Sequence, residues 1–157
     1  MTDPVEPPAS DPAEPPIAVD TSVAVPLLAV AHPDHEAVRS WAQGRDLRLC
    51  GHAIAETYSV LTRLRGRHFV PAAVARAAID GAFDGTLALS TQAGEQVHGL
   101  LEAAGVEGGA VYDALVALAA KEHGLPLATR DARARSHYEV VGVEAILLAQ
   151  GPSAEVG

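Results

Sequence analysis

The chain has 157 residues, of which 48% are hydrophobic and 20% charged, and its 20 acidic and 11 basic residues give a net charge of −9. The length suits one domain, and the apolar fraction is sufficient for a core, so a wholly disordered chain is excluded. The single cysteine, Cys50, excludes an internal disulfide framework, and we expect a small buried side chain there. The longest apolar region, residues 17–31, is interrupted by Asp20 and Pro26 and cannot span a membrane.

The two ends of the chain differ in composition from its middle. Residues 1–16 hold six prolines and four acids but no base, which predicts a disordered tail and is unlike a secretory signal. We expect one folded domain over residues 17–149 and a frayed C-terminus over 150–157. These features favour a cytoplasmic protein.

Short apolar segments alternate with longer segments of helical periodicity inside the predicted domain. In chain order, the pattern predicts a strand at 17–19, helices near 22–30 and 33–43, a strand at 47–50, helices at 53–65 and 71–83, a strand at 86–89, helices at 91–104 and 108–124, a strand at 125–129 and a last strand within 143–148. This alternation is typical of an α/β fold with a parallel sheet covered by helices on both faces.

Two acidic residues follow predicted strands. Asp20 comes directly after residues 17–19, and Asp131 comes just after residues 125–129. Functional sites in open parallel sheets form beyond the C-terminal ends of the strands. Each residue could equally cap the helix that follows it, as Asp often does. Taken singly, the two interpretations are equally good.

Two further acids lie near the starts of predicted helices. Asp113 is the single charge in the stretch AVYDALVALAA, which is apolar all round and therefore predicts a buried helix. An ionised carboxylate buried there is costly unless a positive charge compensates it, although a solvated acid in the first turn is the simpler alternative. Glu56 lies one turn into the helix at 53–65, on an ambiguous face, and alone would be a solvated side chain.

The four acids together indicate a site for a cation. An α/β sheet brings strand ends and the first turns of the following helices to one rim, and neighbouring carboxylates cannot all stay ionised without a cation. Carboxylate oxygens favour Mg²⁺ or Mn²⁺. Such clusters commonly perform phosphoryl chemistry, in which the metal orients water and neutralises charge on the phosphate.

The motifs around these acids resemble a known family. The segments IAVDTSV, AIAETYSVL, VYDALVALAA and LATRDARA occur in the order and at the separations typical of a PIN-domain ribonuclease of the VapC toxin type. The resemblance covers Ile17 to about Ala149. It implies a three-layer α/β/α fold with a central, mainly parallel sheet of about five strands.

The resemblance also implies an activity and partners. It predicts an Mg²⁺- or Mn²⁺-dependent endoribonuclease that cuts single-stranded or loop RNA by metal-activated water, leaving 5′-phosphate and 3′-hydroxyl ends. It implies a toxin that dimerises and is blocked by a cognate antitoxin. Helix faces around residues 22–43 and 53–65 could supply both contacts, and the sequence does not divide them.

Site residues carry over from the family position by position. Asp20, Asp113 and Asp131 would bind the metal, with Glu56 binding directly or through water. The supporting hydroxyls would be those of Thr21, Ser22 and Thr129. Many PIN domains carry an acid or amide two residues after the last Asp, where this chain has Arg133. This departure favours one firmly bound ion, with a second depending on the substrate phosphate.

Two groups of arginines are candidates for RNA contact in this acidic chain. They are Arg63, Arg65 and Arg67 at the end of the helix that holds Glu56, and Arg130, Arg133 and Arg135 beside Asp131. Arginine suits phosphate contacts, although alternating bases are as often a solvated face. Aromatic residues are few, so we expect RNA shape to matter more than an aromatic platform.

Three other interpretations fit these residues less well. An aspartate-nucleophile phosphohydrolase would want Asp-x-Asp where this chain has Asp20-Thr21-Ser22, and a phosphoacceptor domain would want a lysine after a late strand, whereas Lys121 lies near a helix end. A non-catalytic binding module with the same fold would be expected to lack one of the acids. His32 and His35 in HPDHE have no cysteine partner and do not indicate a zinc site.

Overall fold

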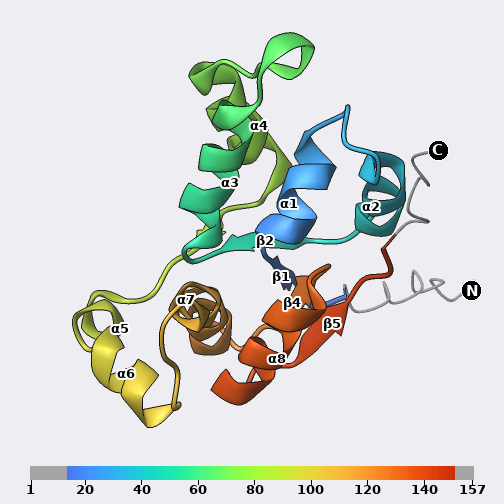
Figure 1. Cartoon of the computed structure of the whole chain (residues 1–157). Helices are drawn as coiled ribbons and strands as arrows, with labels where there is room; N and C mark the ends of the chain where they lie inside the picture. The colour runs from blue at the N-terminus through green and yellow to red at the C-terminus, as the bar shows by residue number, and fades with distance from the viewer. Residues whose placement is uncertain (1–13, 151–157) are drawn as a thin grey trace, which may run out of the picture.

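The computed structural model of the protein describes residues 14–150, apart from the side chain of Arg67. The predicted segments 1–16 and 150–157 therefore lie almost entirely outside the described residues. One parallel sheet runs through the centre of the molecule in the strand order β3-β2-β1-β4-β5 (Figure 1). The strands are β1 Ile17–Val19, β2 Leu47–Cys50, β3 Thr86–Leu87, β4 Leu127–Thr129 and β5 Ala145–Leu147.

Helices cover both faces of the sheet and give three layers (Figure 1). One layer holds α1 Thr21–Leu28, α2 His35–Ala42, α3 Ala53–Arg63 and α4 Ala72–Ala82, with the short η1 Gly66–His68 between the last two. The other holds α7 Ala110–Glu122 and α8 Ala132–Val141, with α5 Thr91–Glu95 and α6 Val97–Ala103 beside α7. The predicted three-layer α/β/α fold with a five-stranded parallel sheet is confirmed. No helix within residues 14–150 has the length and apolar character needed to cross a bilayer.

One predicted helix is divided in the structure, and the structure gives the extent of another that the sequence left open. The single helix predicted at 91–104 is divided into α5 and α6 at Gln96, where ψ is 10° and the helical path is interrupted. Gly94 and Gly99 flank this point, and glycine lowers helix propensity. The sequence places a helix after Asp131 without fixing its extent; in α8 the buried face is formed by Ala134, Tyr138 and Val141, at helical spacing.

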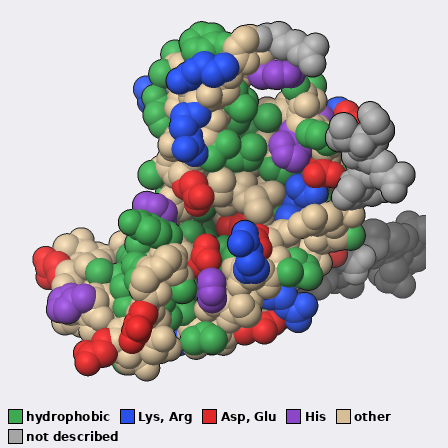
Figure 2. Space-filling model, viewed as in Figure 1, with side chains coloured by type: hydrophobic (Ala, Val, Ile, Leu, Met, Phe, Trp, Pro, Cys, Tyr) green, Lys and Arg blue, Asp and Glu red, His purple; other side chains and the backbone are tan. Residues whose placement is uncertain are grey.

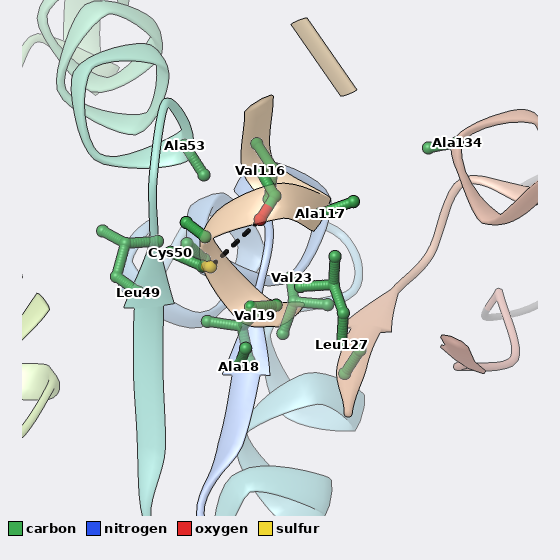
Figure 3. Packing of buried hydrophobic residues seen from close by; sticks show 14 of the residues in the cluster. Ala18, Val19, Val23, Leu49, Cys50, Ala53, Val116, Ala117, Leu127 and Ala134 are labelled. Atoms are coloured by element: carbon green, nitrogen blue, oxygen red, sulfur yellow. Dashed lines mark hydrogen bonds between the residues drawn. The ribbon is translucent and has the colours of Figure 1, made fainter. Parts of the chain in front are cut away.

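The central strands and the helices that cover them form the core (Figure 3). Cys50 at the end of β2 is fully buried, and its thiol donates a hydrogen bond to the carbonyl of Val116 at 3.2 Å. Burial, with a smaller contribution from the negative charge of Asp20, raises the pKa of the thiol to about 12. The prediction of a small buried side chain is confirmed, and an un-ionised thiol of this kind is chemically inert.

The strand order places a crevice between β1 and β4. From β1 the chain moves outward to β2 and β3, then returns to β4 on the other side of β1. Ligands of doubly wound sheets bind at such a switch point, outside the carboxyl ends of the strands. Asp20 follows β1 directly and Asp131 follows β4 closely, so both lie at this crevice. On the surface, a hollow separates the half built from α3 and α4 from the half built from α7, and acidic side chains gather along it (Figure 2).

Candidate functional site

Asp20 is the buried centre of the site. Its side chain is at the end of the central strand, and the residue is only 4% exposed. Oδ1 accepts hydrogen bonds from the Ser22 hydroxyl at 2.6 Å and from the backbone N–H of Val23 at 3.3 Å, so Asp20 also caps α1. Oδ2 accepts a hydrogen bond from the Tyr138 hydroxyl at 2.8 Å. The capping expectation is therefore met, but a cap needs neither this burial nor the contact with Tyr138.

The electrostatics of Asp20 are unusual for a surface cap. Burial raises the pKa of its carboxyl above the ordinary 3.8, and the hydrogen bonds from Ser22, Thr129, Tyr138 and Val23 only partly oppose this. Every donor that the described residues offer this carboxylate is neutral. A buried carboxylate without a positive partner is the kind of group that a bound cation stabilises.

The raised pKa gives an expected pH dependence for protein stripped of divalent cations. As the pH rises above 3.8, Asp20 ionises first in the unfolded chain and only later in the folded chain, so its ionisation destabilises the folded state near neutral pH. We expect Asp20→Asn, which stays neutral, to be more stable than the wild type at about pH 7 in EDTA, with an advantage that shrinks towards about pH 4. Urea unfolding across this range measures it. An Asn variant that is less stable at neutral pH would contradict the expectation.

Glu56 is tied to the site through the first turn of α1. The Thr21 hydroxyl donates a hydrogen bond to Glu56 Oε2 at 2.9 Å, which joins α1 to the first turn of α3. The Glu56 side chain is exposed on the surface of α3. The sequence left open which face of the helix carries Glu56. This contact answers the question, because Thr21 directly follows Asp20 and Glu56 therefore lies on the face of α3 that is turned toward the start of α1.

Asp113 lies in the first turn of α7 and is only half-buried. Its side chain is 36% exposed, which corrects the expectation of burial from the apolar stretch around it. The physical reason is that the helix buries its face from Ala114 to Ala120 while its N-terminal turn reaches the surface. Asp113 Oδ2 lies 2.7 Å from Nδ1 of His137 in α8, a hydrogen bond in which the ring nitrogen is the donor to the ionised carboxylate.

Asp131 is the N-cap of α8. Its Oδ1 accepts a hydrogen bond from the backbone N–H of Arg133 at 2.8 Å. Partial burial raises the pKa of Asp131, but the N–H groups of Arg133 and Ala134 and the Arg133 guanidinium together outweigh it, so the net pKa is lowered. The Asp131 backbone N–H donates to the Thr129 hydroxyl at 3.1 Å, and Thr129 lies 3.3 Å from the Ser22 hydroxyl. Short hydroxyl contacts thus connect Asp131 to Asp20.

The charges of three of the acids act on one buried hydroxyl. The pKa of Tyr138 is raised by its burial, then by the negative charge and hydrogen bond of Asp20, and then by the charges of Asp113 and Glu56. These charges come from the end of β1, from α7 and from α3, so three distant segments of the chain contribute to the electrostatic field at this hydroxyl. As the side chains stand, no three His, Cys, Asp or Glu side chains among residues 14–150 are arranged to hold a metal ion. The donor set still suits a hard divalent cation, because it consists of carboxylate oxygens around a buried, uncompensated Asp20.

The candidate RNA-contact arginines have different surroundings. Arg130 is 8% exposed and its guanidinium binds Asp34 at 2.6 Å, so it is placed to hold the loop before α2. We therefore leave it out of the proposed RNA contacts. Arg135 is bound to Glu139, whereas the Arg133 side chain is 91% exposed and extends beside Asp131. Arg63, the last residue of α3, and Arg65 just beyond it are exposed and donate hydrogen bonds to nearby backbone carbonyls. The side chain of Arg67 lies outside the described residues.

Sequence reasoning missed two residues of the site. Tyr138 and His137 both come from α8 and contact Asp20 and Asp113 respectively. Helical spacing from Ala134 marks Tyr138 as a core position, but no pattern in the sequence indicates that its hydroxyl reaches a residue 118 positions away. His137 has no sequence signal that distinguishes it from a surface histidine.

Comparisons with known proteins agree with this architecture. Residues 17–140 match the PIN domain family. The chain is 52% identical over 137 residues to "Ribonuclease VapC27" of Mycobacterium tuberculosis strain H37Rv, covering 87% of this chain and 99% of that protein. It is 44% identical over 133 residues to "Ribonuclease VapC40" of the same species, covering 84% and 98%.

Solved structures share the fold at low sequence identity. FitAcB from Neisseria gonorrhoeae aligns with a TM-score of 0.58 and 22% identity, over 82% of this chain and 95% of that one. FitAB bound to an IR36 DNA fragment aligns with a TM-score of 0.61 and 20% identity, over 83% and 94%. From the family match and the two curated relatives, we conclude that the chain belongs to the PIN-domain family and, within it, to the group of the VapC ribonucleases.

Proposed function

We propose that this protein is a metal-dependent endoribonuclease that cuts single-stranded or loop RNA and leaves 5′-phosphate and 3′-hydroxyl ends. The observation that carries the proposal is the buried Asp20 at the carboxyl end of the sheet, which has only neutral donors among the described residues and is linked to Asp131 through the hydroxyls of Ser22 and Thr129. The identity to two proteins named as ribonucleases supports RNA as the substrate. Alternatives without catalysis lack a reason to keep an uncompensated buried carboxylate beside other acids.

The proposed metal is Mg²⁺ or Mn²⁺, held by Asp20, Asp113 and Asp131, with Glu56 binding directly or through water. When bound, such an ion supplies positive charge that stabilises the phosphate in the transition state and lowers the pKa of water. Ser22 and Tyr138 hold the two oxygens of Asp20 in fixed directions through their hydroxyl groups. Thr21 holds one oxygen of Glu56 and His137 holds one oxygen of Asp113, which reduces the cost of ordering these acids when the ion binds.

Arg133 is proposed to approach an RNA phosphate next to the acids. Its guanidinium is almost fully exposed and lies only 3.6 Å from Asp131, a contact that is weak at an exposed position. Its presence two residues after Asp131 replaces an acid that could hold a second ion. We therefore propose one firmly bound ion, with a second depending on the substrate phosphate.

The test of this function is cleavage of a broad RNA pool by the purified chain, freed of any bound partner. We expect cutting with Mg²⁺ or Mn²⁺ and none with EDTA, and end-group analysis should find 5′-phosphates. Asp113→Asn purified in parallel controls for contaminating nucleases. Cleavage that persists in EDTA, or that the variant retains, would contradict the metal site. A folded chain that binds RNA and metal but never cuts would favour the non-catalytic binding module.

We further propose that the protein is a toxin held inactive by an antitoxin, that it forms a homodimer, and that it acts on cytoplasmic RNA. The relation to the VapC ribonucleases supports the toxin–antitoxin pairing. Co-expression with its cognate antitoxin should suppress cleavage in proportion to the amount of complex formed. The aspartate-dependent phosphohydrolase remains the less favoured enzyme, because Ser22 stands at the second acid position and instead donates a hydrogen bond to Asp20.

A further inference from the structure

We propose that Tyr112 and His52 form a stacking platform for one RNA base beside the acidic site. The inference rests on the proposed ribonuclease function and adds a binding element to it. The sequence predicted no aromatic platform because aromatic residues are few, but the fold brings two rings together from segments 60 positions apart. The centroids of the two rings are 5.2 Å apart and their planes are inclined by 33°.

The pair joins the two halves of the molecule at the edge of the hollow. His52 directly precedes α3 in one helical layer, and Tyr112 lies in the first turn of α7 in the other. Tyr112 is 59% exposed, which is high for a large aromatic side chain. Its ring therefore has free surface available for a ligand beyond its contact with the half-buried His52.

The platform adjoins the proposed site. His52, Tyr112 and Glu56 line one pocket of about 430 Å³, together with Ala55 and Ser59. Tyr112 immediately precedes Asp113 in α7, and Glu56 is held by Thr21 at the start of α1. A base that rests on Tyr112 would thus belong to a nucleotide very near the phosphate that is positioned by the acids.

The chemistry of this pocket suits a base better than a phosphate. Neither arginine nor lysine is among the residues that line it, and its one charged residue is Glu56. A phosphate would be repelled there, whereas the flat face of a base stacks on an aromatic ring without needing a positive charge. Stacking tolerates every base, so the platform would bind RNA in its single-stranded regions with little sequence preference.

The experiment measures binding of two fluorescent oligonucleotides of equal length, one of mixed-sequence single-stranded RNA and one lacking bases. Binding is followed by anisotropy, in EDTA and again in Ca²⁺. We expect Tyr112→Ala to weaken binding of the base-bearing RNA by about tenfold or more, and to leave binding of the abasic chain unchanged. Tyr112→Phe keeps the ring and should bind as the wild type does. The matched control is Tyr58→Ala, since Tyr58 is 40% exposed on α3 and does not line this pocket.

Several results would overturn the proposal. These are equal affinity of the wild type and Tyr112→Ala for the base-bearing RNA, an equal loss for both oligonucleotides, or a wild type that binds neither. Thermal unfolding of each variant checks that the fold is intact, and Tyr112→Leu serves as the apolar replacement if the alanine variant unfolds. A change only in dimerisation, seen by ultracentrifugation, would assign the pair to an interface between copies and also overturn it.

The outcome for the platform can be separated from that for the ribonuclease function. A wild type that cuts no RNA, but whose binding depends on the Tyr112 ring, would remove the proposed catalysis and keep the platform. If the wild type and Tyr112→Ala cut RNA with the same kcat/KM, the proposed catalysis would stand and the platform would be ruled out.

Discussion

Replacing Asp113 with Asn is expected to lower RNA cleavage by about a thousandfold or more, while the folded structure is retained. The loss follows from removal of one negative charge from the proposed cation site, because an amide oxygen binds a divalent cation far more weakly than a carboxylate. The fold should survive because the side chain is 36% exposed and because the amide oxygen can still accept the hydrogen bond from His137.

The measurement is kcat/KM for a cleaved RNA oligonucleotide, together with the thermal midpoint of each protein. Asp80→Asn is the matched control, since Asp80 is an exposed acid of α4 that pairs with Arg76 and lies outside the site. It removes the same charge from an exposed helix surface and should cleave at the wild-type rate. If Asp113→Asn cut RNA as fast as this control, Asp113 would not be a metal ligand.

Replacing Gly51 with Ala is expected to lower the free energy of unfolding by about 2–4 kcal/mol. Gly51 follows β2 with a φ of +53°, a left-handed conformation that disfavours any residue with a Cβ. An added Cβ would lie 3.0 Å from both the Ala119 side chain and the carbonyl oxygen of Leu115. Since one of these contacts is with the backbone of α7, the new methyl group must push the helix away from the sheet.

Gly44→Ala separates the two causes. Gly44 also has a positive φ, +76°, but a Cβ there would have no neighbour within 4 Å. We expect this variant to lose only about 1 kcal/mol, from backbone strain alone. Urea unfolding of both proteins gives the comparison. Equal losses for the two variants would mean that β2 and α7 are not packed as closely as described.

Much of the architecture follows from the sequence alone. The mainly apolar segments around residues 17–19, 47–50 and 125–129 predict buried parallel strands. Side chains on both sides of such a strand are mostly apolar, so helices must cover both faces of the sheet. An Asp directly after such a strand is then fixed at the carboxyl edge of the sheet, whatever the rest of the chain does. Helical periodicity likewise predicts most helix positions to within a few residues.

The state of each polar side chain was decided by the tertiary structure. Asp113 was expected to be buried because its neighbours are apolar, yet it lies on the exposed first turn of α7. Arg130 was expected at the surface, yet it is buried against Asp34. Local composition reports how much of a segment is buried, but it does not report which turn of a helix reaches the solvent.

Contacts between residues far apart in the chain could not be predicted from the sequence either. The Tyr138 hydroxyl reaches Asp20, His137 reaches Asp113, and the rings of His52 and Tyr112 meet across two helical layers. Each contact depends on how α3, α7 and α8 pack around the sheet, which no periodicity within one segment encodes. The sequence by itself therefore determined the sheet and the acids at its edge, and the packing of the helices decided which groups hold those acids in place.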